Sequence, residues 1–247
     1  MNLKILNKSD KTLKFVLETD AGFANALRRT MTADVPIMAI ENVTIEENRS
    51  GIFDEAVAHR LGMIPMAFDS KLYNLKDECP CGGKGCSRCE VVLILDKTGP
   101  CTAYAGDMKS TADDVKPVDA DIPIAELLDG QKLKFEATAQ LGYGKDHGKW
   151  KAAIVGYQNV AVVRSSDACE EHVFDKKDGK LMLGIEENCT KCMKILDNDG
   201  VKVDENSFLF SVETVSGLKP EEIVNIALNE LEKKSEEFIK EFGKAVK

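Results

Sequence analysis

The chain has 247 residues, of which 43% are hydrophobic and 30% are charged, a composition typical of a folded globular protein and not of a disordered one. Its formal net charge is −9, and because a surface that binds a nucleic-acid duplex is normally electropositive, we expect little direct contact with nucleic acid. The sequence has no apolar run typical of a signal peptide or a membrane span, so we expect no membrane contact and a cytoplasmic location.

The N-terminal part of the chain predicts two strands and two helices. Alternating apolar residues from Leu13 to Leu17 predict a half-buried strand. Residues 21–32 predict a helix, because apolar side chains recur at every fourth position on one face. These side chains are Phe23, Leu27 and Met31. A second strand is predicted near residues 40–45, and a short helix over residues 53–61 with Gly62 as its C-cap.

The middle of the chain predicts further strands. An apolar run over residues 91–95 predicts a buried strand, and alternating apolar residues predict strands over residues 133–141 and within 150–163. Residues 167–202 differ in character, because they are charged, punctuated by glycine and contain three cysteines. We interpret them as a small inserted module.

The C-terminal part predicts a strand over residues 208–212 and then a long helix over residues 220–242. Pro220 is favoured at the first position of that helix. One face of the helix carries an apolar stripe of Val224, Leu228, Leu231, Phe238 and Phe242. Because no further element follows to bury the stripe, we expect it to pack on its own domain, on a partner or on both.

A cysteine-rich loop carries the most specific chemical signal. Its spacing is Cys-x-Cys-x4-Cys-x2-Cys, formed by Cys79, Cys81, Cys86 and Cys89. Four thiolates in one short loop can converge on a tetrahedral zinc ion, and a set of four sulfurs leaves no position for water, which predicts a structural zinc site. The alternatives are free thiols, an iron–sulfur cluster, or a zinc-binding chaperone of the Hsp40 type, whose glycine-rich cysteine repeat this loop matches in part.

A second group of metal-ligand side chains lies in the inserted module. Cys169, Cys189 and Cys192 occur there, with His172 close to the first. Three cysteines and a histidine can bind zinc, and three cysteines alone can hold a 3Fe–4S cluster. The third alternative is a degenerate module that binds no metal.

Enzyme motifs are missing from the sequence. It contains no phosphate-binding loop, no dinucleotide-binding glycine pattern and no nucleophile elbow. We therefore predict no catalytic residue and favour a structural or binding role.

Four segments resemble one known family. Residues 23–31, followed by Val35-Pro36, resemble the N-terminal assembly motif of the RNA polymerase alpha family, and residues 54–65 look like a second signature of that family. The cysteine loop, running into residues 91–93, is similar to the zinc loop in the third-largest subunit of eukaryotic polymerase II. Residues 208–222 resemble the closing strand and helix of the family. These matches occur in order, and they indicate the archaeal branch of the family, the D-type subunits of DNA-directed RNA polymerase.

The resemblance implies an α+β fold with three parts. An assembly (dimerisation) domain would be built from both chain ends, residues 1–45 and 203–247. An inserted, mainly β domain with the zinc loop would cover residues 46–166. Residues 167–202 would be a small ferredoxin-like module, degenerate because Ile195 stands where cluster-bearing members would place another cysteine.

The resemblance also implies a role and partners. The chain would be a non-catalytic subunit of DNA-directed RNA polymerase that heterodimerises with the small subunit L. With subunits N and P, the pair would form the platform for the large catalytic subunits. The two apolar helix faces would contact subunit L, and Arg28 and Arg29 would contact a large subunit. Two functions of other classes are a free-standing zinc-binding chaperone or adaptor, and a small redox enzyme that uses the second cysteine group.

Overall fold

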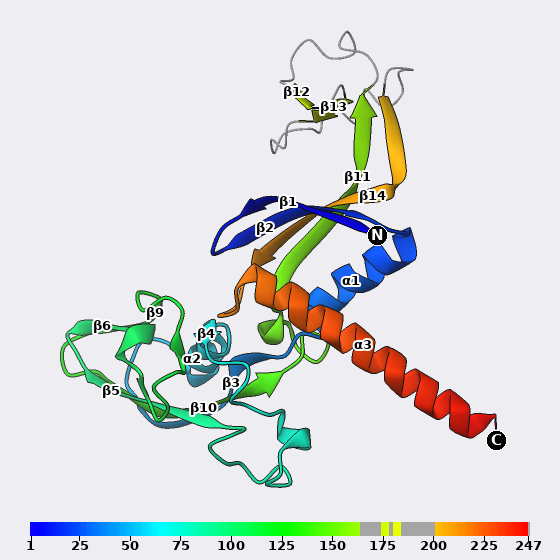
Figure 1. Cartoon of the computed structure of the whole chain (residues 1–247). Helices are drawn as coiled ribbons and strands as arrows, with labels where there is room; N and C mark the ends of the chain where they lie inside the picture. Colours follow the sequence, from blue (N-terminus) through cyan, green and yellow to red (C-terminus); the bar gives the residue numbers. More distant parts are fainter. Residues whose placement is uncertain (164–173, 178–179, 184–200, 247) are drawn as a thin grey trace. The chain divides into compact units, whose positions relative to one another are not determined.

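The computed structural model describes residues 1–163, 174–177, 180–183 and 201–246. The fold is α+β, with mostly antiparallel sheets and, in the part of the chain that is described, three α-helices (Figure 1). The chain divides into two compact units. The first comprises Met1–Arg28 with Val155–Val212, and the second comprises Arg29–Ile154 with Glu213–Lys247.

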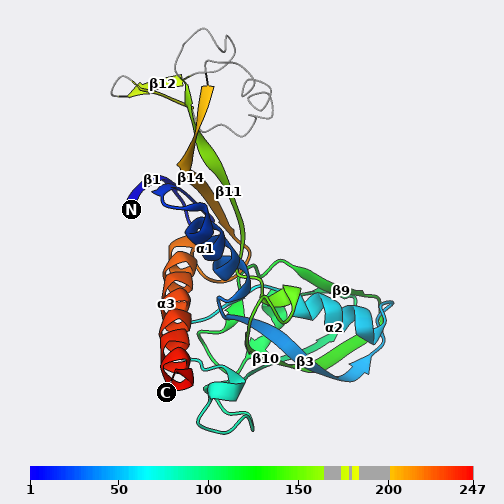
Figure 2. The same ribbon diagram turned by 90° about the vertical axis from the view of Figure 1, so that its right-hand side faces the viewer.

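A six-stranded sheet dominates the first unit, with strand order β1-β2-β14-β11-β13-β12. Figure 2 labels β1, β14, β11 and β12 of this sheet. Its strands are β1 (Asn2–Lys8), β2 (Thr12–Glu18), β11 (Ala153–Val163), β12 (Phe174–Lys177), β13 (Lys180–Leu183) and β14 (Val201–Thr214). The alternation predicted around Phe15 is confirmed, because every second side chain of β2 is buried. Phe15 stacks on Phe210 with a ring-centroid distance of 5.0 Å. The core of this unit therefore includes the apolar face that the neighbouring strands β2 and β14 share.

Helix α1 (Ala21–Ala33) confirms the predicted N-terminal helix. The carboxylate of Asp20 caps its first turn by accepting a hydrogen bond of 2.9 Å from the backbone N–H of Phe23. A side-chain oxygen at this position satisfies one of the backbone donors that a helix start leaves open. The predicted start of the helix thus has a physical cause in its cap.

A four-stranded sheet, in the order β3-β10-β5-β7, dominates the second unit. These strands are β3 (Ile37–Asn48), β5 (Val91–Thr98), β7 (Lys109–Ser110) and β10 (Lys132–Gly142). Two short pairs accompany the sheet: β4 (Met66–Ala67) with β8 (Lys116–Pro117), and β6 (Cys101–Tyr104) with β9 (Pro123–Leu127). Phe135 of β10 lies opposite Leu95 of β5 and Ile45 of β3, and all five alternating apolar residues of β10 are buried. The strand predicted over residues 133–141 is thus central to the sheet.

Helix α2 (Asp54–Gly62) is the predicted short helix, but its C-terminal end lies one residue later than predicted. Gly62 was expected as the C-cap, but it is the last helical residue and Met63 is the cap. Met63 keeps a right-handed backbone with φ −92° and donates its N–H to the Arg60 carbonyl, so no left-handed glycine is needed there. Phe53, placed on the apolar face by its spacing, is 83% exposed, whereas Val57 and Leu61 are buried.

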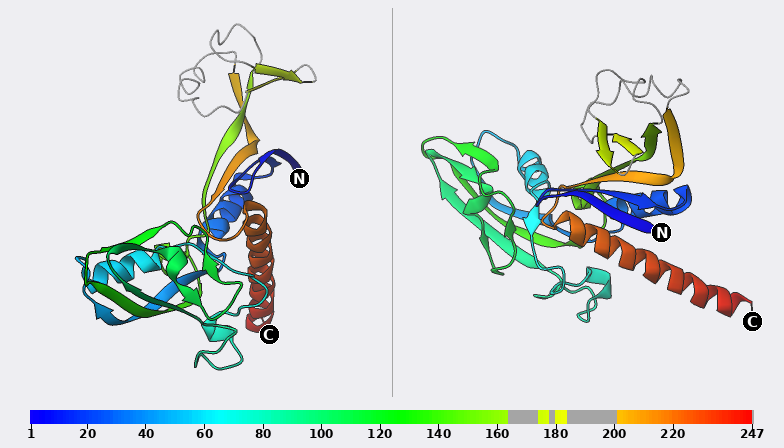
Figure 3. Two further views of the ribbon diagram at one scale, coloured as in Figure 1. Left: turned by 90° about the vertical axis from the view of Figure 1, so that its left-hand side faces the viewer. Right: turned by 45° about the horizontal axis from the view of Figure 1, so that its top comes forward.

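Helix α3 (Pro220–Ala245) is the long C-terminal helix, and Pro220 occupies its first turn as predicted. Glu222 accepts a 2.9 Å hydrogen bond from the backbone N–H of Lys219 and so caps the start. The right-hand view of Figure 3 shows α3 as one continuous helix whose C-terminal part extends beyond the sheet of its own unit. Among the described residues, no helix combines the length and apolar character that a membrane crossing requires.

Candidate functional site

The four cysteines of the loop converge on one point. Their Sγ atoms all lie within 4.8 Å of one another. The separations are 3.5 Å from Cys79 to Cys86, 3.6 Å from Cys81 to Cys89 and 3.8 Å from Cys86 to Cys89. Four metal–sulfur bonds of about 2.3 Å in a tetrahedron separate the sulfurs by about 3.8 Å. The cluster therefore has the size and the donor set to hold one metal ion.

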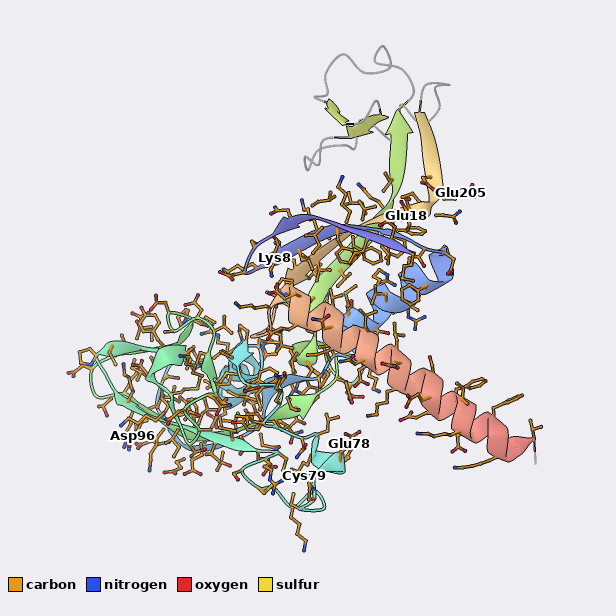
Figure 4. All side chains as sticks on the ribbon, viewed as in Figure 1. Lys8, Glu18, Glu78, Cys79, Asp96 and Glu205 are labelled. Carbon is orange, nitrogen blue, oxygen red and sulfur yellow. The ribbon has the colours of Figure 1, made fainter. Side chains whose placement is uncertain are left out.

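Three glycines with positive φ angles allow the four cysteines to converge within so short a loop. Gly82, Gly83 and Gly85 have φ values of 65°, 77° and 89°, a region in which a Cβ is disfavoured. The chain turns back at Gly82, whose N–H donates to the Cys79 carbonyl over 2.9 Å. These glycines allow the first cysteine pair to face the second. A short 3-10 helix, η1 (Lys76–Glu78), precedes the loop and β5 follows it; Figure 4 labels Glu78 and Cys79 at this entrance.

The thiols differ strongly in acidity. The hydrogen bond from the Cys79 thiol is the largest effect that lowers the pKa of Cys81, to about 6. Burial raises the pKa of Cys89 to about 12. One sulfur of the group is therefore a ready thiolate, and the proton on Cys89 must leave before that sulfur can bind a metal.

The second predicted metal group, Cys169, Cys189 and Cys192, lies outside the described residues. Within the described part of the chain, the loop cysteines are the one group of metal-ligand side chains close enough to share an ion.

The predicted partner residues of α1 have different surroundings. Leu27 and Met31 are buried and Phe23 is half-buried. Arg28 is half-buried and donates to the Asn25 side-chain oxygen over 3.0 Å, and Arg29 is exposed. Of the apolar residues predicted for this contact on α1, only Phe23 therefore keeps part of its side chain at the surface. A partner contact through this helix stays a prediction.

Along α3 the burial of apolar side chains changes from one end to the other. The buried residues are Pro220, Ile223 and Ala227, all in the first third of the helix. The predicted stripe runs from half-buried to exposed, with Val224 and Leu231 half-buried and Leu228, Phe238 and Phe242 exposed.

The far end of α3 carries an exposed apolar surface, which we call the distal patch: Phe238, Ile239, Phe242 and Val246. Phe238 and Phe242 are 70% and 59% exposed, and their rings stack with centroids 6.0 Å apart. Ile239 is 69% exposed. Sequence reasoning missed Ile239 and Val246, although their helical spacing from Leu231 and Phe242 was the signal that could have found them.

Ion pairs connect the middle of α3 to other parts of its unit. Lys234 lies 2.8 Å from the carboxylate of Asp34, which is also 3.9 Å from Lys145. Lys233 lies 3.6 Å from Glu78, next to the first cysteine of the loop. Burial, with the nearby carboxylates led by Glu230, raises the pKa of Tyr143 to about 12. One exposed ion pair, from Lys233 to Glu78, therefore links α3 to the start of the cysteine loop.

Comparison with known proteins places the chain in one family. Residues 43–162 match the family model described as the RNA polymerase Rpb3/RpoA insert domain. The chain is 39% identical to the DNA-directed RNA polymerase subunit Rpo3 of Methanosarcina acetivorans, with 97% of each chain covered. It is 38% identical to the Rpo3 subunit of Pyrococcus furiosus, with 99% of this chain and 98% of the relative covered. The Rpo3 subunit of Archaeoglobus fulgidus is 35% identical, with 96% of each covered.

The relatives are archaeal and their similarity covers almost the full length, as the resemblance in the sequence motifs implied. The chain belongs to the Rpo3 family of DNA-directed RNA polymerase subunits, the archaeal alpha-like subunits.

Proposed function

We propose that this chain is a non-catalytic assembly subunit of DNA-directed RNA polymerase. In this proposal it heterodimerises with the small subunit L, and with subunits N and P the pair forms the platform on which the large catalytic subunits assemble. Family membership supports the polymerase role. The lack of enzyme motifs in the sequence supports a role without an active site of its own.

The distal patch is the observation that carries the heterodimer proposal. Three large apolar side chains, Phe238, Ile239 and Phe242, lie more than half exposed within two turns of α3. Contiguous apolar surface of this kind marks interaction sites in soluble proteins. An amphipathic helix that leaves its apolar side exposed is suited to pack against helices of a second chain.

A pull-down with co-expressed subunit L tests this proposal. Replacing Phe238 and Phe242 with Glu puts two charges into the contact, and we expect co-purification with subunit L to fall by at least about tenfold, since one buried unpaired charge costs several kcal/mol. The matched control is Lys240→Ala with Lys244→Ala, which changes the net charge of the same helix end by the same amount. Undiminished co-purification of the Phe variant would contradict the proposal.

We also propose that the cysteine loop binds one structural zinc. Four thiolate donors match the preference of zinc and leave no coordination position for water. The ion would therefore cross-link the loop and would not take part in catalysis. The ligands would be Cys79, Cys81, Cys86 and Cys89.

Metal analysis of anaerobically purified protein, co-expressed with subunit L, tests the metal assignment. About one zinc per chain without iron is expected for a structural zinc loop and a degenerate module at residues 167–202. Iron with a visible absorbance band would instead assign a cluster to Cys169, Cys189 and Cys192. A chain without zinc would contradict the zinc proposal.

The three-part organisation remains part of the same proposal. Residues 1–45 and 203–247 would form the assembly domain, residues 46–166 the insert domain and residues 167–202 the third module. Limited proteolysis of the complex with subunit L should cleave first at the boundaries near residues 166 and 203 and leave the other two parts intact. First cuts inside either of the other parts would contradict these boundaries.

A further inference from the structure

The two chain segments at the base of the cysteine loop are tied together by groups outside the four sulfurs. The backbone N–H of Asn74, before the loop, donates to the carbonyl of Arg88 over 2.8 Å. Two residues further on, the ammonium of Lys76 pairs with the carboxylate of Glu90. Lys76 begins η1, and Glu90 lies between the last cysteine and β5. The entrance and the exit of the loop are therefore joined by one backbone contact and one ion pair.

The ion pair is partly protected from solvent. The side chains of Lys76 and Glu90 are 34% and 23% exposed. Those of the pair Lys244 and Glu241 on α3 are 73% and 72% exposed. Screening by water weakens exposed pairs, so partial burial favours a measurable contribution from this one.

Glu90 also packs against the turn of the loop. A Cβ built on Gly85 would collide with the Oε2 atom of Glu90. The carboxylate thus fills the space that a side chain at position 85 would take. The backbone of Gly85 in turn makes a hydrogen bond to the sulfur of Cys81, one of several contacts, led by the Cys79 thiol, that lower the pKa of Cys81. Glu90 thereby contacts both the base of the loop and the turn beside a ligand.

Lys76 lies in the electric field of the sulfurs. The hydrogen bond to Glu90 is the main cause that raises the pKa of Lys76, and the charges that Cys89 and Cys81 would carry as thiolate ligands raise it further. A divalent ion with four thiolates carries a net charge of about −2. A nearby ammonium stabilises that charge, as outer groups around a metal generally do.

We propose that Lys76 and Glu90 form a clamp at the base of the loop, the neck clamp, which holds the four cysteines in their metal-binding arrangement and slows release of the metal. Both are positioning residues: Glu90 sets the turn at Gly85, and Lys76 holds Glu90 and offsets the negative charge of the thiolates. The proposal rests on metal binding by the loop, and the experiment separates the two.

The test is the rate at which the zinc-loaded full-length chain releases zinc to a colorimetric chelator in excess. We expect Lys76→Ala and Glu90→Gln to release zinc roughly 10-fold faster or more, the usual size of effects from groups that support metal ligands. Lys84→Ala is the matched control, because it removes the same charge from the exposed outer part of the same loop. Its release rate should equal that of the unmodified chain.

Two further variants distinguish a specific pair from general loosening of the loop. Lys76→Arg keeps the charge and should restore slow release. In the double variant Lys76→Ala with Glu90→Gln, the effects of the two single changes should not add, because each change breaks the same contact.

Each contrary outcome has a distinct meaning. Equal release rates for Lys76→Ala, Glu90→Gln and Lys84→Ala in zinc-loaded protein would overturn the clamp and leave the zinc proposal intact, and so would additive effects in the double variant. An unmodified chain that takes up no zinc would overturn both.

Discussion

At the scale of single residues, Gly85 has the most demanding position in the described structure of the loop. Its φ of 89° is disfavoured for residues with a side chain, and Glu90 occupies the space next to its Cα. Both constraints act in the turn between Cys81 and Cys86. A side chain there would strain the backbone and displace Glu90 at once.

Substitution of Gly85 by Ala is expected to weaken metal binding by the loop. The left-handed backbone alone costs about 1 kcal/mol for a residue with a Cβ, and displacement of Glu90 adds to it. We expect less zinc per chain after gel filtration with a mild chelator. Gly51→Ala is the control, because nothing lies within 4 Å of the Cβ it would add. If both variants keep the same zinc, the turn does not need a glycine.

Tyr73 gives a prediction for pH dependence. Burial and a 2.9 Å hydrogen bond to the carboxylate of Asp114 raise the pKa of Tyr73 to about 12. Because the folded chain holds the phenol proton more tightly than the unfolded chain, this group contributes stability that is complete below about pH 10. That contribution is lost as the pH rises from about 10 to about 12.

The Tyr73→Phe variant should lose the stability that Tyr73 contributes and with it part of the alkaline pH dependence. At pH 8 the free energy of unfolding should fall by about 1 kcal/mol, because one hydrogen bond is removed and the Asp114 oxygen loses its donor. The difference from the unmodified chain should shrink above about pH 10. Urea unfolding at about pH 8 and about pH 10.5 measures it, and a difference that grows with pH would contradict the assignment.

At the scale of elements, α3 has two parts with different surroundings. Its first third contains the buried side chains of Ile223 and Ala227, and in its middle Lys234 pairs with Asp34. Its last turns expose the distal patch. The first part should therefore govern folding of the chain, and the last part should govern binding of a partner.

Two alanine substitutions on α3 should separate these roles. Ile223→Ala leaves a cavity at a fully buried position and should lower the free energy of unfolding of the isolated chain by roughly 2–5 kcal/mol. Phe238→Ala should change it by less than about 0.5 kcal/mol, as at other exposed positions. Binding to subunit L should respond in the opposite order. Equal stability losses in urea unfolding would show that Phe238 is covered within the chain.

At the scale of the whole molecule, acidic charge and an exposed apolar surface occur together. The net charge is −9, whereas the distal patch is formed by uncharged side chains. Association through such a patch depends on burial of apolar area, which salt does not screen. Binding to a nucleic-acid duplex, by contrast, weakens steeply as salt rises.

Affinity for subunit L should accordingly be nearly independent of salt. Between about 0.1 M and about 0.5 M NaCl, we expect less than about a threefold change in the dissociation constant. The added salt screens interactions between charges, whereas the burial of apolar side chains is not screened. Isothermal titration at the two salt concentrations measures this. A loss of tenfold or more would mean that ion pairs dominate the interface.

Local patterns were sufficient for several elements and for the cysteine cluster. The alternation around Phe135 predicted β10, because a period of two places one set of side chains on one face of a sheet. Pro220 marked the first turn of α3. The four cysteines of the cluster were found because they lie within eleven residues, so spacing and glycines alone bring them together. Strand β1 was missed because its three apolar residues, Leu3, Ile5 and Leu6, do not keep a period of two over the whole strand.

By itself, the sequence determined the α+β class, the four-cysteine loop and the family, since each depends on residues close together in the chain or on motifs in a fixed order. Tertiary structure alone decided which side chains are covered. Periodicity indicated an apolar face on α1 and α3, but not that Leu27 and Met31 are buried while Phe238 is exposed. It was also tertiary structure that decided that Lys76 pairs with Glu90 across the base of the loop. The physical reason is that burial and ion pairing depend on which distant segments pack together, and no local pattern records that choice.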